Sequence, residues 1–153
     1  ELAREKLRQQ AGSYDRESRQ SGIMQMKLTE IDALRAYARM MNTLDVSHIE
    51  PLLDEDFRYS SQWMIGEIPS KQEFLDYMKS MLDSVKQSGN RVYAEIAHAN
   101  AWGHDECAVT AEGDKENLVA CVFAHVKDGK IRRIDVCGDP PPSATQRTGE
   151  YPS

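Results

Sequence analysis

Residues 91–138 read RVYAEIAHANAWGHDECAVTAEGDKENLVACVFAHVKDGKIRRIDVCG. Glycine-containing turns divide this segment into four runs that are rich in strand-forming residues. We expect the strands at about 91–100, 104–112, 116–127 and 130–138. Asp128-Gly129 predicts a tight hairpin between the last two strands, because Asp-Gly favours the type I′ turn that joins antiparallel strands. The segment therefore predicts a long antiparallel sheet.

Two amphipathic helices are predicted before this sheet. The first begins at Thr29, where Thr29-x-x-Asp32 resembles a capping box and apolar side chains then recur at three- and four-residue spacing. The second begins with a Ser-x-x-Glu pattern at Ser70 and ends at Gly89. A strand is predicted between the helices at 56–63. This order predicts an α+β fold in which a cone-shaped, curled, antiparallel or mixed β-sheet wraps around helices.

The composition is that of an ordinary globular protein. The 153 residues are 40% hydrophobic and 29% charged, and the formal net charge is −6. A nucleic-acid module carries a basic face, so we expect no nucleic-acid partner. No apolar run approaches the roughly 20 residues that span a bilayer, and the first residues contain no apolar signal-peptide core. We therefore expect a cytoplasmic protein with no membrane partner.

The three cysteines fall in or at the ends of the predicted strands: Cys107, Cys121 and Cys137. An odd number without tight spacing is typical of reduced thiols in a cytosolic protein. A metal site is the alternative, because three histidines fall in the same predicted sheet: His98, His104 and His125. No Cys-x-x-Cys or His-x-x-x-His spacing supports that alternative. We expect neither a metal nor a cofactor.

The chain divides into three segments by composition. Residues 1–27 form a polar N-terminal arm, and residues 28–139 form the α+β barrel domain. Residues 140–153 are a proline-rich C-terminal tail, which we expect to run extended over the surface and partly cover the entrance of a pocket.

The order of helix, short helix, strand, helix and curled sheet, ending in Asp-Gly-Lys-Ile-Arg-Arg-Ile, resembles the nuclear-transport-factor-2-like superfamily. This superfamily of cone-shaped, cystatin-like α+β barrels includes ketosteroid isomerase and the SnoaL-type polyketide cyclases. The similarity covers roughly residues 28–139, and the segments 37–45 and 52–57 resemble the start of ketosteroid isomerase without a gap. The superfamily contains enzymes, binding proteins and interaction modules alike, so the resemblance implies a pocket and leaves its use open.

Of the three site residues of ketosteroid isomerase, the resemblance gives only one a chemical counterpart in this chain. Tyr37 falls where that family keeps its oxyanion-hole tyrosine. Ser61 falls at the position of the catalytic base and Phe123 at that of the second oxyanion donor, and neither side chain can do that chemistry. Epoxide-hydrolase members need a carboxylate about where Val136 stands. We therefore expect neither mechanism in its family form.

A pocket remains the main functional expectation, although the apolar character of both faces of strand 116–127 leaves its lining ambiguous. The resemblance implies that Cys121, Phe123 and His125 face the cavity. We predict Tyr37, Tyr59 and His125 as catalytic donors or base. The predicted ligand-binding residues are Met41, Phe57, Ser61, Trp63, Met78, Cys121, Phe123, Ile134 and Val136. The alternatives are a core role for Tyr37, mutual hydrogen bonding of Tyr59 and Ser61, and a structural role for His125.

Three functions fit these residues. The first is acid–base catalysis on a small apolar carbonyl or hydroxyl compound, as in an isomerase, dehydratase, cyclase or hydrolase. The second is non-catalytic binding of a small hydrophobic or amphipathic molecule, and the third is a dimeric interaction module with a vestigial pocket. We also predict a homodimer formed sheet to sheet, because one sheet face would otherwise expose its apolar side chains. The residues assigned to that face are Leu118, Ala120, Val122, Ala124, Val126, Ile131, Arg133 and Asp135.

Overall fold

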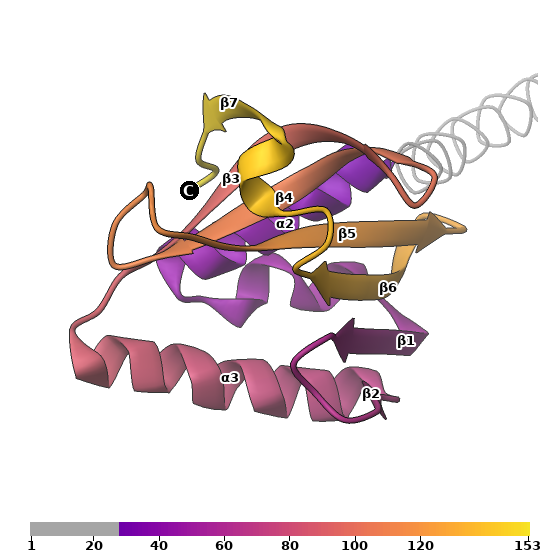
Figure 1. Ribbon diagram of the computed structural model, residues 1–153. Coiled ribbons are helices and arrows are strands. Elements are labelled where there is room, and N and C mark those ends of the chain that lie inside the picture. The colour runs from indigo at the N-terminus through magenta and orange to yellow at the C-terminus, as the bar shows by residue number, and fades with distance from the viewer. Residues whose placement is uncertain (1–27) are drawn as a thin grey trace, which may run out of the picture.

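The computed structural model describes residues 28–153, so the predicted N-terminal arm lies outside the described residues. The fold is α+β, with helices packed against a seven-stranded mixed sheet (Figure 1). The helical elements are α2 (Glu30–Thr43), α3 (Lys71–Ser88) and the short 3₁₀ turns η1 (Val46–His48), η2 (Glu50–Leu52) and η3 (Pro142–Ala144). The strands are β1 (Leu53–Ser61), β2 (Glu67–Ile68), β3 (Val92–Ala101), β4 (His104–Glu112), β5 (Leu118–Lys127), β6 (Lys130–Cys137) and β7 (Gln146–Glu150). The predicted fold class is confirmed.

Both long helices begin where the capping patterns predict. The Asp32 amide donates to Thr29 Oγ1 at 3.3 Å, and the Thr29 amide donates to Asp32 Oδ2 at 3.0 Å. The Glu73 amide donates to Ser70 Oγ at 3.2 Å, which starts α3 in the same way. In residues 28–153, no helix combines the length and the apolar character that crossing a membrane requires.

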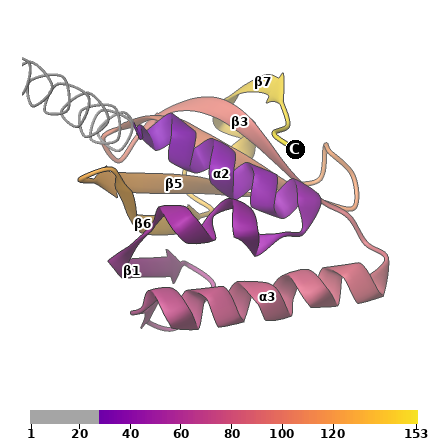
Figure 2. The ribbon, with the colours of Figure 1, turned by 180° about the vertical axis from the view of Figure 1, so that it is seen from behind.

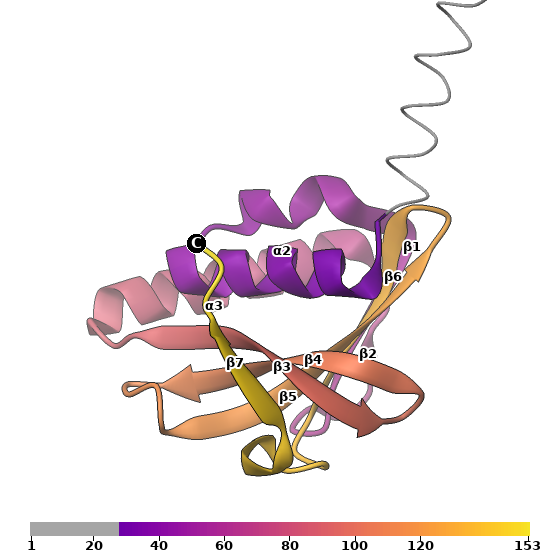
Figure 3. The same ribbon diagram turned by 90° about the horizontal axis from the view of Figure 1, so that it is seen from above.

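The sheet has the strand order β2-β1-β6-β5-β4-β3-β7, and among the strands of residues 28–153 only β1 and β6 pair in parallel. Figure 2 shows α2 lying across β3 and β5, while α3 runs alongside β1. Figure 3 shows that α2 and α3 lie on the same side of the curled sheet. We call the sheet face beneath these helices the inner face and the opposite one the outer face. The main hydrophobic core fills the space between the inner face and the helices.

The inner face of β5 carries Ala120, Val122 and Ala124, and the outer face carries Cys121 and Phe123. The predicted orientation of β5, with Cys121 and Phe123 facing inward, is therefore wrong.

The resemblance put Phe123 and Ile134 on the same face, and a β-bulge in β6 separates them. Val126 pairs with Ile131, but His125 pairs with Arg133, so Arg132 is an extra residue. Counting back from the Asp128-Gly129 turn without a bulge would pair Phe123 with Ile134. The structure instead pairs Ala124 with Ile134. A slip of one residue moves every side chain of a strand to the other face.

The surface predicted for dimerisation is not available in this fold. Ala120, Val122 and Ala124 are buried beneath the helices. Asp135 lies directly opposite Phe123, so it belongs to the outer face and not to the same surface as Val122. The assignment of these residues to one exposed face is therefore wrong, because the helices already cover the face that carries the alanines and valines.

The C-terminal tail adds a strand to the sheet. β7 pairs antiparallel with β3 and forms one edge, so residues 146–150 do not simply run over the surface. Arg35 of α2 forms an ion pair with Glu150, with Nε and Oε2 2.8 Å apart. The Asn42 amide group donates to the carbonyl oxygens of Ala94 at 2.9 Å and Pro152 at 2.7 Å. These bonds join α2, β3 and the tail into one unit.

Candidate functional site

A cavity of ≈ 370 Å³ opens on the inner face, between the sheet and the two long helices. This volume lies within the range of about 300–1,000 Å³ that is typical of small-molecule sites. The cavity is lined by Tyr37, Met41, Tyr59, Ser61, Trp63, Tyr77, Met81, Val92, Thr110, Ala111, Glu112, Val119, Ala120 and Val136. No residue of the tail belongs to this lining, so the tail does not cover the cavity as expected.

Three tyrosines from three different elements line the cavity together. Tyr37 lies on the buried face of α2, Tyr59 on the inner face of β1 and Tyr77 on α3. Tyr37 is only 4% exposed and Tyr59 only 5%. The rings of Tyr59 and Tyr77 have centroids 5.8 Å apart, and Phe74 supports Tyr59 from the core at 5.1 Å. The arrangement concentrates phenol groups in a mostly apolar space.

The electrostatics of the cavity keep the two buried phenols protonated. Burial raises the pKa of Tyr37 well above its usual value, and the neighbouring Tyr77 adds to the shift. Burial also raises the pKa of Tyr59, with further contributions from Tyr37 and Tyr77. At neutral pH, Tyr37 and Tyr59 therefore present neutral hydroxyl groups that can donate to a ligand oxygen.

The remaining polar groups of the lining are Ser61, Thr110 and Glu112. Ser61 Oγ accepts a hydrogen bond from the Trp63 amide at 3.3 Å, so this hydroxyl supports the turn after β1. Glu112 ends β4, and its backbone is held by Asn117, whose carbonyl oxygen accepts from the Glu112 amide at 3.1 Å. Within the described part of the chain, the Glu112 carboxylate forms no ion pair. Glu112 is exposed, and among the described residues it is the acidic residue of the cavity lining.

Sequence reasoning identified part of this lining. The predicted residues Tyr37, Met41, Tyr59, Ser61, Trp63 and Val136 all line the cavity. The lining residues that were not predicted are Tyr77, Val92, Thr110, Ala111, Glu112, Val119 and Ala120. The signal for Tyr77 was present, because it precedes Met81 by four residues and so shares its side of α3. Glu112 was read only as the residue before the Gly113 turn.

Other predicted site residues belong to the core. Phe57, Met78 and Ile134 are almost fully buried in the main hydrophobic cluster and are not part of the cavity wall. Phe57 packs on Phe74 with ring centroids 4.7 Å apart. In this structure these three side chains support the cavity from behind.

The remaining predicted residues, Cys121, Phe123 and His125, are separated from Tyr37 by the sheet. Phe123 and His125 line a different hollow of ≈ 260 Å³ on the outer face, with Trp102, His104, Asp135 and Cys137. His125 packs edge-on against His104, with ring centroids 4.6 Å apart, and its Nε2 lies 3.8 Å from Asp135 Oδ2. The predicted cavity that combines His125 with Tyr37 is therefore wrong, because the two side chains lie on opposite faces.

Cys107 and Cys121 form a buried pair beneath the outer face. Their mutual hydrogen bond raises the pKa of Cys107, with burial adding to the shift, and lowers the pKa of Cys121. Burial also raises the pKa of Cys137. In the part of the chain that the structure describes, no three His, Cys, Asp or Glu side chains are grouped as metal ligands would be.

Taken together, the curled sheet, the two helices and the enclosed tyrosines define a cone-shaped α+β barrel with an internal cavity. The chain belongs to the SnoaL-like domain family, whose sequence model matches residues 34–134. The resemblance to the nuclear-transport-factor-2-like superfamily is thereby confirmed.

Comparison with solved structures shows the same fold. An NTF2-like protein of unknown function from Cytophaga hutchinsonii is 17% identical with a TM-score of 0.51, over 75% of this chain and 94% of that one. A SnoaL-like protein of unknown function from Burkholderia thailandensis is 15% identical with a TM-score of 0.52, over 71% and 95%. No curated protein sequence matches the chain.

Proposed function

We propose that the protein binds a small, mostly apolar molecule in the inner cavity and holds its carbonyl or hydroxyl oxygen with tyrosine hydroxyls. The carrying observation is that Tyr37, which is 4% exposed and whose raised pKa keeps its hydroxyl protonated, lines the cavity together with Tyr59 and Tyr77. A protonated hydroxyl in a mostly apolar wall can donate a hydrogen bond to a ligand oxygen. Met41, Met81 and Val136 supply the apolar part of the wall.

A fluorinated ketone tests this proposal. We expect 4-fluoroacetophenone to bind to the protein in a fluorine NMR titration. Native mass spectrometry of the purified protein shows whether a metabolite co-purifies. Tyr37→Phe should weaken binding about two- to tenfold, which is the effect of one hydrogen bond. Tyr93→Phe is the matched control, because Tyr93 lies outside the cavity lining. Equal affinity of the Tyr37→Phe variant and the control would contradict the assignment.

A second proposal is that the cavity also transfers a proton, since Glu112 places one unpaired carboxylate in the same wall as Tyr37. In this scheme a carbon–hydrogen bond next to the ligand carbonyl breaks, and the proton passes to the Glu112 carboxylate. The electron pair moves to the carbonyl oxygen, which the Tyr37 hydroxyl stabilises. Return of the proton to the ligand completes an isomerisation or exchange.

Deuterium exchange separates catalysis from binding. In D₂O, the methyl group of 4-fluoroacetophenone should exchange its hydrogens faster with the protein than without it. Glu112→Gln should reduce this rate about 100-fold or more, the scale of general base catalysis, while binding persists. Asp105→Asn, at the other end of β4, is the control and should leave the rate unchanged. If 4-fluoroacetophenone binds but its deuterium exchange is not accelerated, the protein binds the ligand without catalysing proton transfer.

The proposal includes a homodimer formed through the outer face and a cytoplasmic location. The outer face carries its own hydrophobic cluster around Phe123, and Trp102 beside it is 68% exposed. A large exposed side chain next to an apolar hollow is typical of an interface. The three thiols of Cys107, Cys121 and Cys137 are free, in keeping with a reducing compartment.

A further inference from the structure

A separate hollow of ≈ 430 Å³ lies beside the C-terminal segment and has a different chemical character from the tyrosine cavity. It is lined by Asn42, Leu44, Asn90, Arg91, Val92, Tyr93, Lys115, Tyr151 and Ser153. Only Val92 is shared with the wall of the inner cavity. Two cations and two tyrosines therefore face one hollow that the proposed function does not use.

The two tyrosines and Lys115 form one packed group. The rings of Tyr93 and Tyr151 meet edge to face, with centroids 6.4 Å apart. Lys115 Nζ lies 4.3 Å from the centroid of Tyr151 and 5.6 Å from that of Tyr93. The faces of aromatic rings are electron-rich, so they hold the ammonium group at the edge of the hollow.

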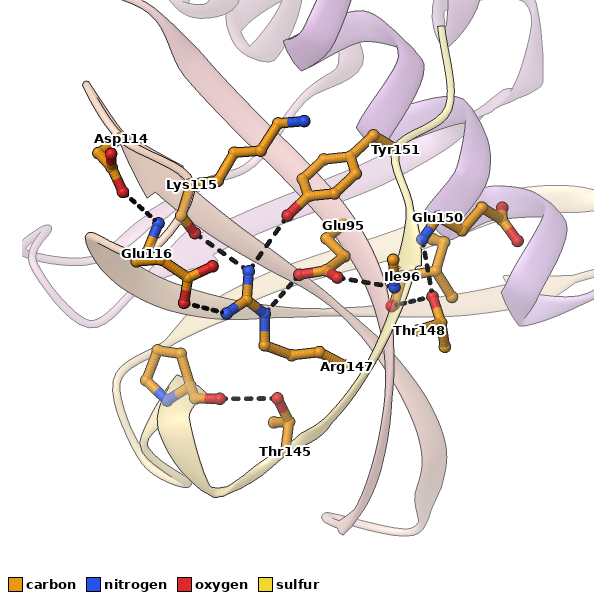
Figure 4. A network of polar contacts seen from close by, with 12 residues as sticks. Glu95, Ile96, Asp114, Lys115, Glu116, Thr145, Arg147, Thr148, Glu150 and Tyr151 are labelled. Carbon is orange, nitrogen blue, oxygen red and sulfur yellow. Dashed lines mark hydrogen bonds and ion pairs between the residues drawn. The ribbon is translucent and has the colours of Figure 1, made fainter.

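Arg147 fixes this group from below, as Figure 4 shows. Its Nη2 donates to the Tyr151 hydroxyl at 3.1 Å and to the Lys115 carbonyl oxygen at 3.1 Å. The same guanidinium binds the carboxylates of Glu95 and Glu116, each at 2.6 Å. The carboxylates of Glu95 and Glu116 are thus engaged by Arg147, and Lys115 forms no ion pair within the described residues.

Arg91 supplies the second cation. Its carbonyl oxygen accepts a hydrogen bond from the Gly113 amide at 2.7 Å, which ties the backbone of this position to the end of β4. Within residues 28–153, its guanidinium has no ion pair. The carbonyl oxygen of Ser153, which also lines the hollow, accepts from Arg39 Nε at 3.3 Å.

The formal net charge of the whole protein is −6. Arg91 and Lys115 nevertheless line this hollow, and among residues 28–153 no Asp or Glu belongs to its lining. A guanidinium pairs with the planar oxygens of a carboxylate or phosphate, and tyrosine rings stack against a planar group. We infer that this hollow is a binding site for a small organic anion that carries a planar ring.

Fluorine NMR titration with 4-fluorobenzoate at low ionic strength tests this inference. We expect the unmodified protein to bind this anion more tightly than neutral 4-fluorobenzyl alcohol, and added salt to weaken the binding. The double substitution Arg91→Gln and Lys115→Gln should reduce the affinity about tenfold, because each exposed ion pair contributes roughly a two- to fivefold effect. Both side chains are exposed, so the fold should persist.

Two controls make the outcome specific. Lys127→Gln removes one positive charge at the opposite end of β5 and should leave 4-fluorobenzoate binding unchanged. Inorganic phosphate should bind more weakly than 4-fluorobenzoate, because it lacks the ring. Equal affinity of the double variant and the unmodified protein would overturn the inference. A loss of the same size in Lys127→Gln would also overturn it, since binding would then follow overall charge. Binding of 4-fluoroacetophenone in the inner cavity should be unaffected by the double substitution.

Discussion

Glu95 shows how a single buried charge is tolerated in this protein. Its side chain is 5% exposed, and its two oxygens accept from Arg147 Nε at 2.6 Å and from the Gly149 amide at 2.8 Å. Burial of a carboxylate is costly unless both its charge and its hydrogen-bonding capacity are met. At the residue scale, Arg147 therefore neutralises the charge of Glu95 and also positions Tyr151 at the adjacent hollow.

Substitution of Arg147 should show how strongly the stability of the fold depends on its ion pair with Glu95. We expect Arg147→Met to lower the free energy of unfolding by about 2–3 kcal/mol, because it leaves Glu95 buried without its cation. The combined Arg147→Met and Glu95→Met variant should be less destabilised than Arg147→Met alone, since no buried charge remains unpaired. Urea unfolding followed by circular dichroism measures both values. A double variant that is at least as unstable as Arg147→Met alone would contradict this dependence.

At the scale of elements, β7 depends on side chains that reach it from α2. Arg35 pairs with Glu150, and its guanidinium lowers the pKa of the Glu150 carboxyl below the ordinary value of 4.5. A carboxyl whose pKa is lower in the folded state stabilises the fold above its ordinary pKa. That contribution is lost as the pH falls through the folded-state pKa. Both side chains are about two-fifths exposed, so solvent screens the pair and the effect is modest.

The attachment of β7 should therefore weaken in acid. We expect Glu150→Gln to be slightly less stable than the unmodified protein at pH 7, by about 0.5 kcal/mol. This difference should shrink as the pH falls from about 5 to 3, because the unmodified protein loses the ion pair there. Urea unfolding midpoints at several pH values provide the measurement. A difference that stays constant over this range would mean that Glu150 acts through contacts other than its charge.

The elements themselves were largely predictable from sequence, and the faces of one strand were not. Capping side chains at Thr29 and Ser70 mark the helix starts, and those bonds form as expected. For β5, apolar side chains occupy both faces, so the usual alternation of apolar and polar residues gave no orientation. The resemblance put Phe123 on the face of Ile134, but the bulge at Arg132 pairs Ile134 with Ala124, and no sequence signal marks a bulge there. Tyr37 and Tyr59 line the inner cavity, whereas His125 lies on the outer face.

At the scale of the whole molecule, the two faces of the sheet have separate roles in the proposed function. The inner face encloses the cavity with the helices, and the outer face leaves Trp102 exposed beside Phe123 and His125. Trp102 is held in a defined position, because its Nε1 donates to the Asp139 carbonyl oxygen at 3.1 Å. A fixed and exposed aromatic side chain is well suited to anchor an interface.

The proposed homodimer can be tested at Trp102. We expect the unmodified protein to sediment as a dimer at micromolar concentration and Trp102→Ser to shift it towards the monomer. Trp63→Ser is the matched control, since Trp63 is also exposed but belongs to the opposite face. Analytical ultracentrifugation gives the molecular mass directly. A monomeric unmodified protein would exclude the dimer, and a dimeric Trp102→Ser variant would place the interface elsewhere.

The pairing of β7 with β3 has a consequence during synthesis. β3 emerges from the ribosome before β4, β5 and β6, and β7 follows all of them. One edge of β3 therefore has no strand beside it until the end of the domain has been made, and an unpaired edge can pair with another chain. Changes that slow the arrival of β7 should consequently reduce the yield of soluble protein in cells more than they reduce the melting temperature of the purified protein.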